Sequence, residues 1–185
     1  MSGLYLASQS PRRTELLHQV GIDHTVVTSS YVEDNVVITD PIEMVKAQAL
    51  GKARCANDVP DGSIVLGADT IVVFDGKVLG KPHSKDEART MLRTLSGQVH
   101  SVITGVALLI KGREIVFHNE TKVYFKTLQD FEIESYIDSM EPMDKAGAYG
   151  IQGIGGVFVE SIEGCYYNVV GLPLNTLRSV LKEIV

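Results

Sequence analysis

The sequence predicts a single α/β domain, residues 1–185, in which helices flank a mixed β-sheet. Apolar segments typical of strands alternate with amphipathic segments that begin at capping residues, which is the pattern of crossover helices. Two pairs of apolar segments are instead separated by tight-turn residues, so parallel and antiparallel strands should share the sheet. The chain has 185 residues, 44% of them hydrophobic, which is enough for a core without disulfides or metals.

Strand and helix signals alternate through the first part of the chain. Ser10 and Pro11 suit the N-cap and the first position of a helix, and Gly21 suits the residue after its end. Asp40, followed three residues later by Glu43, repeats the capping chemistry. The expected elements are strands at residues 4–7 and 25–28 and helices that begin at Pro11 and Pro41.

Turn and cap signals divide the rest of the chain. Asp75-Gly76 and Lys111-Gly112 predict hairpins, and Ser84 with Glu87 predicts a capping box. The glycine-rich residues 147–156 show no periodicity, and Pro173 begins a last helix. The expected strands are residues 63–68, 70–74, 77–79, 99–110, 114–126, 157–161 and 166–170, and the expected helices are residues 84–97 and 127–139.

Charge and targeting signals exclude several classes of protein. Seventeen basic and 23 acidic residues give a net charge of −6, which argues against a nucleic acid polymer as partner because binding one needs phosphate neutralisation. Cys55 and Cys165 show neither zinc spacing nor a disulfide pattern. The N-terminus has no signal-peptide pattern, and the longest apolar run, residues 102–110, is too short to span a bilayer. We therefore expect a soluble, cytoplasmic protein with no membrane association.

The first candidate binding site is Ser8-Gln9-Ser10-Pro11-Arg12-Arg13, where a strand turns into a helix. Free N–H groups at a helix N-terminus, together with hydroxyls and guanidiniums, form a suitable cradle for phosphate. The alternative is ordinary capping by Ser10 and two solvated arginines. Basic residues at this end of a helix oppose its dipole, so we favour an anion here, with Ser8, Arg12 and Arg13 as ligands.

The second candidate is Asp69, which follows a buried apolar segment at a position where α/β proteins often bind ligands. The alternative is a turn or cap aspartate between two strands. Lys81, in Leu79-Gly80-Lys81-Pro82, follows the first hairpin and can point back to the same place. The glycine spacing around it is too short for a P-loop, and Pro82 replaces the hydroxyl residue.

Three further polar residues lie in less specific surroundings. Lys52 is on the second helix and Glu33 in a polar loop, where a solvated lysine and a surface acid are the ordinary interpretations. Gln152 lies among glycines that allow close approach of a ligand, although a flexible loop explains them equally well. The glycines do not match a dinucleotide-binding fingerprint, and the five histidines lack metal-ligand spacing. Together the separated basic residues with Glu33 and Asp69 suggest phosphate-ester chemistry with a divalent cation.

Several motifs, in order along nearly the whole chain, resemble the Maf family of nucleoside triphosphate pyrophosphatases. The segment Asp144–Gly153 resembles the branch of that family that acts on dTTP and UTP. The matching motifs are Ser8–Arg13, Gly67–Thr70, Gly80–Pro82, Leu95–Gly97, Asp144–Gly153 and Gly171–Leu174.

The resemblance implies a cytoplasmic homodimer that hydrolyses a nucleoside triphosphate between its α- and β-phosphates, giving the monophosphate and pyrophosphate. The biological use would be to clear excess or modified pyrimidine nucleotides. The implied cofactor is Mg²⁺, with Mn²⁺ as the alternative. The implied fold resembles that of inosine triphosphate pyrophosphatases: an elongated mixed sheet flanked by helices, with two lobes around a cleft.

The resemblance also implies roles for individual residues. Asp69 would accept the proton of the attacking water and ligate the metal, and Glu33 would be a second acid at the metal. The phosphate-holding cations would be Arg13, Lys52 and Lys81. The residues that set base preference would be Arg12, Thr70 and Gln152.

Two interpretations from other classes of protein stay open. One is a nucleotide-binding regulator of cell division, which the family's name suggests. The other is a structural module that binds phosphate. Neither needs an acid beside a metal and a water, so the role of Asp69 separates them from an enzyme.

Overall fold

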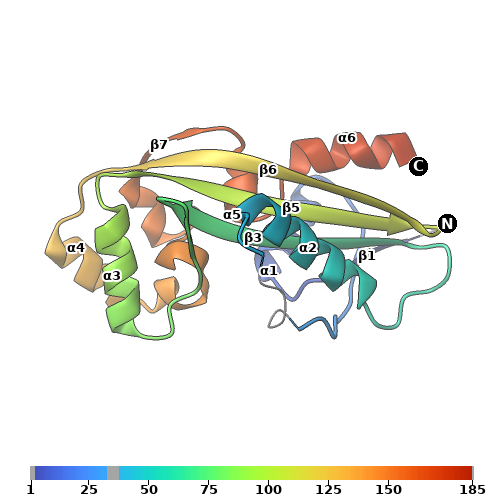
Figure 1. Ribbon diagram of the computed structural model, residues 1–185, viewed down its shortest axis with the longest axis horizontal. Helices are drawn as coiled ribbons and strands as arrows, with labels where there is room; N and C mark the ends of the chain where they lie inside the picture. Colours follow the sequence, from blue (N-terminus) through green and yellow to red (C-terminus); the bar gives the residue numbers. More distant parts are fainter. Residues whose placement is uncertain (1–2, 33–37, 185) are drawn as a thin grey trace. The chain divides into compact units, whose positions relative to one another are not determined.

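The computed structural model describes residues 3–32 and 38–184, and their strands form one mixed sheet flanked by helices (Figure 1). The strands are β1 (Leu4–Leu6), β2 (Thr25–Val26), β3 (Ile64–Phe74), β4 (Lys77–Leu79), β5 (Val99–Ile110), β6 (Arg113–Phe125) and β7 (Val159–Glu163). Their order is β2-β1-β3-β5-β6-β7, with β4 also paired to β3. β1 is parallel to β2 and β3, whereas β3–β4 and β6–β7 are antiparallel, which confirms the predicted fold class.

Six α-helices and three short 3-10 helices are found among the described residues. The α-helices are α1 (Pro11–Gln19), α2 (Pro41–Arg54), α3 (Lys85–Leu95), α4 (Asp130–Asp138), α5 (Tyr166–Val170) and α6 (Leu174–Ile184). The 3-10 helices are η1 (Glu141–Asp144), η2 (Ala146–Ala148) and η3 (Ile154–Phe158). No helix in the described ranges is both long enough and apolar enough to cross a membrane.

The chain forms two compact units, which share the long strands β3, β5 and β6. The first unit comprises Met1–Thr70, Thr104–Asn119 and Gly171–Val185, and the second comprises Ile71–Ile103 and Glu120–Val170. Each unit is described by itself below. That the whole chain is one domain stays a prediction.

In the first unit, α2 packs with its backbone unusually close to two neighbouring strands. A Cβ atom on Gly67 of β3 would overlap the carbonyl oxygen of Ala49, and one on Gly105 of β5 would overlap that of Val45. The side chains of the helix at this contact are small: Ala49 and Ala53 are both buried there. Asp40 begins the helix as predicted, accepting a hydrogen bond of 2.9 Å from the backbone N–H of Glu43.

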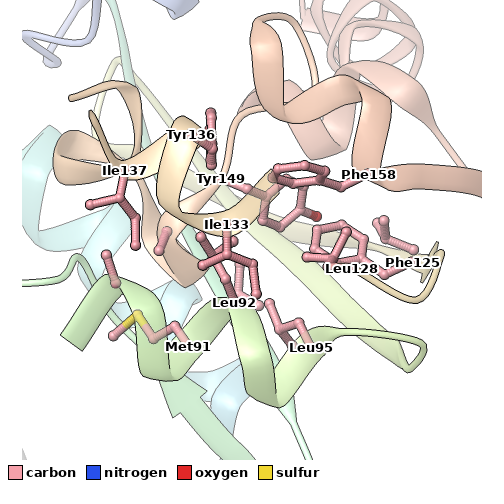
Figure 2. Close-up of a cluster of buried hydrophobic side chains, with 14 of the residues drawn as sticks. Met91, Leu92, Leu95, Phe125, Leu128, Ile133, Tyr136, Ile137, Tyr149 and Phe158 are labelled. Carbon is pink, nitrogen blue, oxygen red and sulfur yellow. The ribbon is translucent and has the colours of Figure 1, made fainter. Parts of the chain in front are cut away.

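The second unit is built around a larger core of aliphatic and aromatic side chains (Figure 2). Met91, Leu92 and Leu95 come from one face of α3, and Ile133 and Ile137 come from α4. The cluster also contains Phe125, Leu128, Tyr136, Tyr149 and Phe158. Burying large side chains from consecutive elements stabilises this unit mainly through the hydrophobic effect.

Three ion pairs align α3 with α4 along their solvent side. Lys85, Arg89 and Arg93 recur every four residues on α3 and pair with Asp138, Glu134 and Asp130, which recur every four residues in the reverse order on α4. This order requires the two helices to run antiparallel. Exposed pairs contribute little free energy each, so their main effect is on the register of the helices.

One expected strand is a helix instead. Residues 166–170 were expected to be extended because Tyr and Val favour strands, but they form α5. The reason is tertiary: Asn168 is fully buried, and its Nδ2 donates to the carbonyl of Val102 and to the hydroxyl of Thr121. Burial of a polar side chain with satisfied donors outweighs a modest preference for extended structure.

His100 is a buried titratable residue in the second unit. Its Nε2 lies 2.8 Å from the hydroxyl of Tyr149, and its ring packs edge-on against Phe125. Burial lowers the pKa of His100 from its ordinary value of 6.5 to about 4, since a charged imidazole would lose its hydration. The folded protein therefore favours the neutral ring.

The depressed pKa of His100 predicts a loss of stability in acid. His100 takes up a proton near pH 6.5 in the unfolded chain and near pH 4 in the folded chain. Its contribution to the free energy of unfolding is therefore complete above pH 6.5 and is lost as the pH falls toward 4. Between pH 7 and pH 4 it amounts to about 3 kcal/mol. Chemical denaturation at both pH values should show a smaller acid loss for His100→Gln by that amount. Equal acid losses in the two proteins would contradict this.

Candidate active site

The strand-to-helix turn after β1 brings Ser8 and Arg13 together. The Ser8 hydroxyl accepts hydrogen bonds from Nη1 of Arg13 at 2.9 Å and from the backbone N–H of Ser10 at 3.3 Å. Ser10 occupies the N-cap position of α1, with Pro11 following as predicted, but its hydroxyl caps no backbone N–H. Ser8, rather than Ser10, therefore provides the side-chain acceptor for a backbone N–H at this end of α1.

Three protein acceptors surround the guanidinium of Arg13. Its Nε donates to the carbonyl of Gly171 at 2.9 Å, and its Nη2 donates to the hydroxyl of Thr70 at 3.1 Å. The Thr70 hydroxyl also lies 2.9 Å from that of Thr104. Only 9% of Arg13 is exposed. The structure thus joins Ser8, Arg13 and Thr70, three of the residues singled out from the sequence, in one hydrogen-bonded network.

Asp69 and Lys52 form a second contact, an ion pair with 2.6 Å between Nζ and Oδ1. Asp69 is in β3, and Lys52 is in the last turn of α2. Their side chains are 13% and 20% exposed, so the pair is largely shielded from solvent. In such surroundings the attraction between the charges is stronger than at an open surface.

The sequence suggested that Asp69 follows the end of a strand. In the structure Asp69 lies in the middle of β3. β3 continues without a break from Ile64 to Phe74. The strand that ends nearby is its parallel neighbour β1, whose last residue Leu6 is paired with Leu66. Asp69 therefore extends beyond the carboxyl end of β1, which is the kind of position where α/β proteins bind ligands.

The contact of Asp69 with Lys52 and the contact of Thr70 with Arg13 lie on opposite faces of β3. Successive side chains of a strand alternate in direction, so Asp69 shares a face with Gly67 and Thr70 points the other way. The face of Gly67 is the one that α2 covers, which places Lys52 beside Asp69.

The remaining predicted residues divide between the units. Arg12 is half-buried in the first turn of α1. Lys81 and Gln152 both belong to the second unit and are exposed. Their segments meet there, because the N–H of Gly147 donates to the carbonyl of Gly80 at 3.0 Å. Glu33 lies outside the described residues.

Glu141 and Tyr136 were not among the residues singled out from the sequence. The Glu141 carboxylate accepts hydrogen bonds from the Tyr136 hydroxyl and from the backbone N–H groups of Ile154 and Gly155. These amides belong to the glycine-rich segment that follows Gln152. One signal was present: backbone N–H groups of a segment without regular structure must find acceptors elsewhere.

The charges at this contact favour an ionised Glu141. Burial by itself would raise the pKa of Glu141, but the two backbone N–H groups, the tyrosine hydroxyl and the charge of Lys145 together lower it. Burial raises the pKa of Tyr136, and its hydrogen bond to Glu141 adds to this. Near neutral pH the tyrosine hydroxyl is thus protonated and donates to a carboxylate.

Among the described residues of the site, Asp69 has a carboxylate that could take part in holding a divalent cation. No group of three or more His, Cys, Asp and Glu side chains suited to a metal occurs in residues 3–32 and 38–184. Mg²⁺ often takes one or two carboxylates and completes its coordination with substrate phosphates and water. The carboxylate of Asp69 suits that mode of binding.

These features define an α/β protein with a shielded acid–lysine pair and a separate arginine–hydroxyl network. The model of the family described as Maf-like protein matches residues 3–184. The chain belongs to this family.

Relatives with high identity carry a common name. A dTTP/UTP pyrophosphatase of Symbiobacterium thermophilum is 52% identical over 183 residues, covering 99% of this chain and 94% of the relative. Proteins of the same name from Bacillus cytotoxicus and Bacillus anthracis are 48% and 45% identical, covering 99% of this chain and 96% of each relative. Among solved structures, the Ham1 protein of Staphylococcus aureus gives a TM-score of 0.44 at 15% identity, covering 67% of this chain and 72% of that chain.

The close approach of α2 to β3 predicts that Gly67→Ala destabilises the protein. The added Cβ would meet two backbone groups, the carbonyl of Ala49 and the N–H of Ala53, which cannot move without moving the helix. We expect a loss of about 1–3 kcal/mol in the free energy of unfolding, measured by chemical denaturation. Gly80→Ala is the control, since nothing lies within 4 Å of a Cβ there. Equal stability of the two variants would disprove the constraint.

Proposed function

We propose that this protein is a nucleoside triphosphate pyrophosphatase that hydrolyses dTTP and UTP to the monophosphate and pyrophosphate. The observation that carries the proposal is the shielded ion pair of Asp69 and Lys52, which provides a proton acceptor and a phosphate-binding cation in one place. The names of relatives at 45–52% identity over almost the whole chain support the choice of substrate. The role of such an enzyme is to clear excess or modified pyrimidine nucleotides.

Asp69 is the proposed general base. A water molecule attacks the α-phosphorus, its oxygen forms the new bond, and the bond from phosphorus to the bridging oxygen of the β-phosphate breaks. Asp69 takes the proton of that water, and pyrophosphate leaves with the electron pair of the broken bond. When substrate binds, a phosphate oxygen competes with the Asp69 carboxylate for the ammonium group of Lys52, because both acceptors are anionic.

The arginine–hydroxyl network is the proposed support for the triphosphate. Arg13 is held on three sides by Ser8, Thr70 and Gly171, so its charge occupies a fixed position before substrate arrives. Fixed charge of this kind stabilises the negative charge that develops in the transition state without reorganisation. Lys52, Lys81 and Ser8 are the other proposed phosphate ligands, and the phosphates are common to all nucleotides.

The proposed cofactor is a divalent cation, Mg²⁺ with Mn²⁺ as the alternative, held by Asp69 and Glu33 and shared with the substrate. Such a cation neutralises charge on the phosphates during the displacement. The support in the structure is the carboxylate of Asp69, which is shielded but reachable. The protein is further proposed to act as a homodimer in the cytoplasm, which rests on the family resemblance.

Gln152, Arg12 and Thr70 are the proposed determinants of base preference. The amide of Gln152 offers one acceptor and one donor, which match the N3–H and O4 of uracil and thymine. Cytosine presents the opposite polarity at that edge and should be rejected. Thr70 has a hydroxyl oriented by Arg13 and Thr104.

Asp69→Asn should lower turnover of dTTP and UTP by about a hundredfold or more, because the amide keeps the shape but cannot accept the proton. Pyrophosphate release with Mg²⁺ present measures this, and a chelator should abolish the activity of the unaltered protein. Asp75→Asn, in the exposed turn after β3, is the matched control. Near-normal turnover of Asp69→Asn would favour a binding protein or a structural module. Release of orthophosphate instead of pyrophosphate would refute cleavage between the α- and β-phosphates.

Gln152→Ala should lower kcat/KM for UTP and dTTP by about tenfold or more, with a much smaller change for CTP and GTP. The reason is that Gln152 would contact the base edge, whereas the phosphates are common to all four substrates. The measurement is kcat/KM for each nucleotide, with Gln98→Ala, another exposed glutamine of the second unit, as control. A uniform loss for all four nucleotides would make Gln152 a structural residue.

A further inference from the structure

The segment that carries Gln152 is tied down on both sides of that residue by the Tyr136–Glu141 pair. On the N-terminal side, the N–H of Gly150 donates to the Tyr136 hydroxyl at 3.1 Å. On the C-terminal side, the N–H groups of Ile154 and Gly155 donate to the two oxygens of Glu141 at 2.9 and 3.2 Å. The Tyr136 hydroxyl donates in turn to Glu141 at 2.9 Å, which joins the two ends through one pair of side chains.

The glycines of this segment leave room for the side chains that surround it. A Cβ on Gly153 would overlap both carboxylate oxygens of Glu141, and one on Gly155 would lie 2.6 Å from the Tyr136 hydroxyl. A Cβ on Gly150 would lie 2.6 Å from the side chain of Lys145. The glycines therefore allow the backbone to wrap closely around a carboxylate, which argues against a freely flexible loop.

Both members of the pair are anchored outside the segment. The Tyr136 side chain belongs to α4 and is only 1% exposed, packed in the cluster of Figure 2. Glu141 begins η1, and the Nζ of Lys145 donates to its backbone carbonyl at 2.8 Å. Hydrogen bonds to an ionised acceptor are stronger than neutral ones, so the pair can hold a segment that has little regular structure.

We propose that Glu141, with Tyr136, is the positioning residue that sets the base selectivity of this enzyme by fixing the segment that presents Gln152. This inference rests on the proposed function of Gln152 as the residue that contacts the base. Recognition of a base edge depends on the directions of two hydrogen bonds, which a displaced backbone does not preserve. The proposed phosphate ligands lie outside this segment, so a loosened segment should affect discrimination between bases more than turnover.

Two variants test the pair independently. Tyr136→Phe removes only the hydroxyl and leaves the ring in the core, and Glu141→Ala removes the carboxylate. Glu141→Gln keeps one carbonyl acceptor and should restore part of what Glu141→Ala loses. Glu160→Gln is the matched control, because Glu160 is an exposed acid of β7 in the same unit.

The first measurement is hydrogen exchange of the backbone amides, which needs no substrate. We expect the amides of Ile154 and Gly155 to exchange about tenfold faster or more in Glu141→Ala, and that of Gly150 to do so in Tyr136→Phe. Unchanged exchange in both variants would overturn the inference. Thermal unfolding shows which variants are folded, and Tyr136→Phe still tests the pair if Glu141→Ala does not fold.

The second measurement is the ratio of kcat/KM for UTP to that for CTP. We expect this ratio to fall by about tenfold in Glu141→Ala and Tyr136→Phe, with partial recovery in Glu141→Gln and no change in Glu160→Gln. Faster exchange with an unchanged ratio, or an equal loss for both nucleotides, would overturn the role in selectivity while the proposed activity stands. Failure of the unaltered protein to hydrolyse UTP would overturn the proposed function and the selectivity role together, and hydrogen exchange would still report whether the pair holds the segment.

Discussion

The contact between the backbone of α2 and the glycines of β3 and β5 determines the geometry of the first unit. Because Gly67 and Gly105 lack side chains, the helix lies against the sheet at the distance of backbone contact. At that distance the side chain of Lys52, in the last turn of the helix, reaches Asp69 on the same face of β3 as Gly67. A wider spacing would separate the charges, and the shielded acid–lysine pair on which the proposed chemistry depends would not form.

The second unit uses glycine for a related purpose with a different partner. There the backbone of residues 150–155 folds around the carboxylate of Glu141, and the glycines leave room for its oxygens. In the first unit glycine admits a helix, and in the second it admits an acceptor for backbone N–H groups that have no regular partners. In both units a proposed functional side chain lies near such a glycine. Lys52 pairs with Asp69, two residues after Gly67, and Gln152 directly precedes Gly153.

Local chemistry predicted many elements well, and the differences share a cause. The cap at Asp40, the turns at Asp75-Gly76 and Lys111-Gly112, and the termination of α1 before Gly21 follow from contacts between near neighbours in sequence. The extended structure expected at residues 166–170 was wrong because Asn168 reaches acceptors more than 40 residues away. The break expected at Asp69 was wrong, because β3 continues past the end of its partner β1. The sequence of β3 does not reveal where β1 ends.

By itself, the sequence determined the class of fold, the order of most strands and helices, and the polar motifs that carry the family resemblance. These depend on periodicity, capping and composition, which operate over a few residues. Only the tertiary structure decided that Arg13 is enclosed by Ser8, Thr70 and Gly171, that Lys52 pairs with Asp69, and that Glu141 holds the segment around Gln152. The partners in these contacts are separated by between 5 and 158 positions, so no local pattern specifies them. They form because burial obliges each charge and each backbone N–H to find a partner, and the fold decides which partner is within reach.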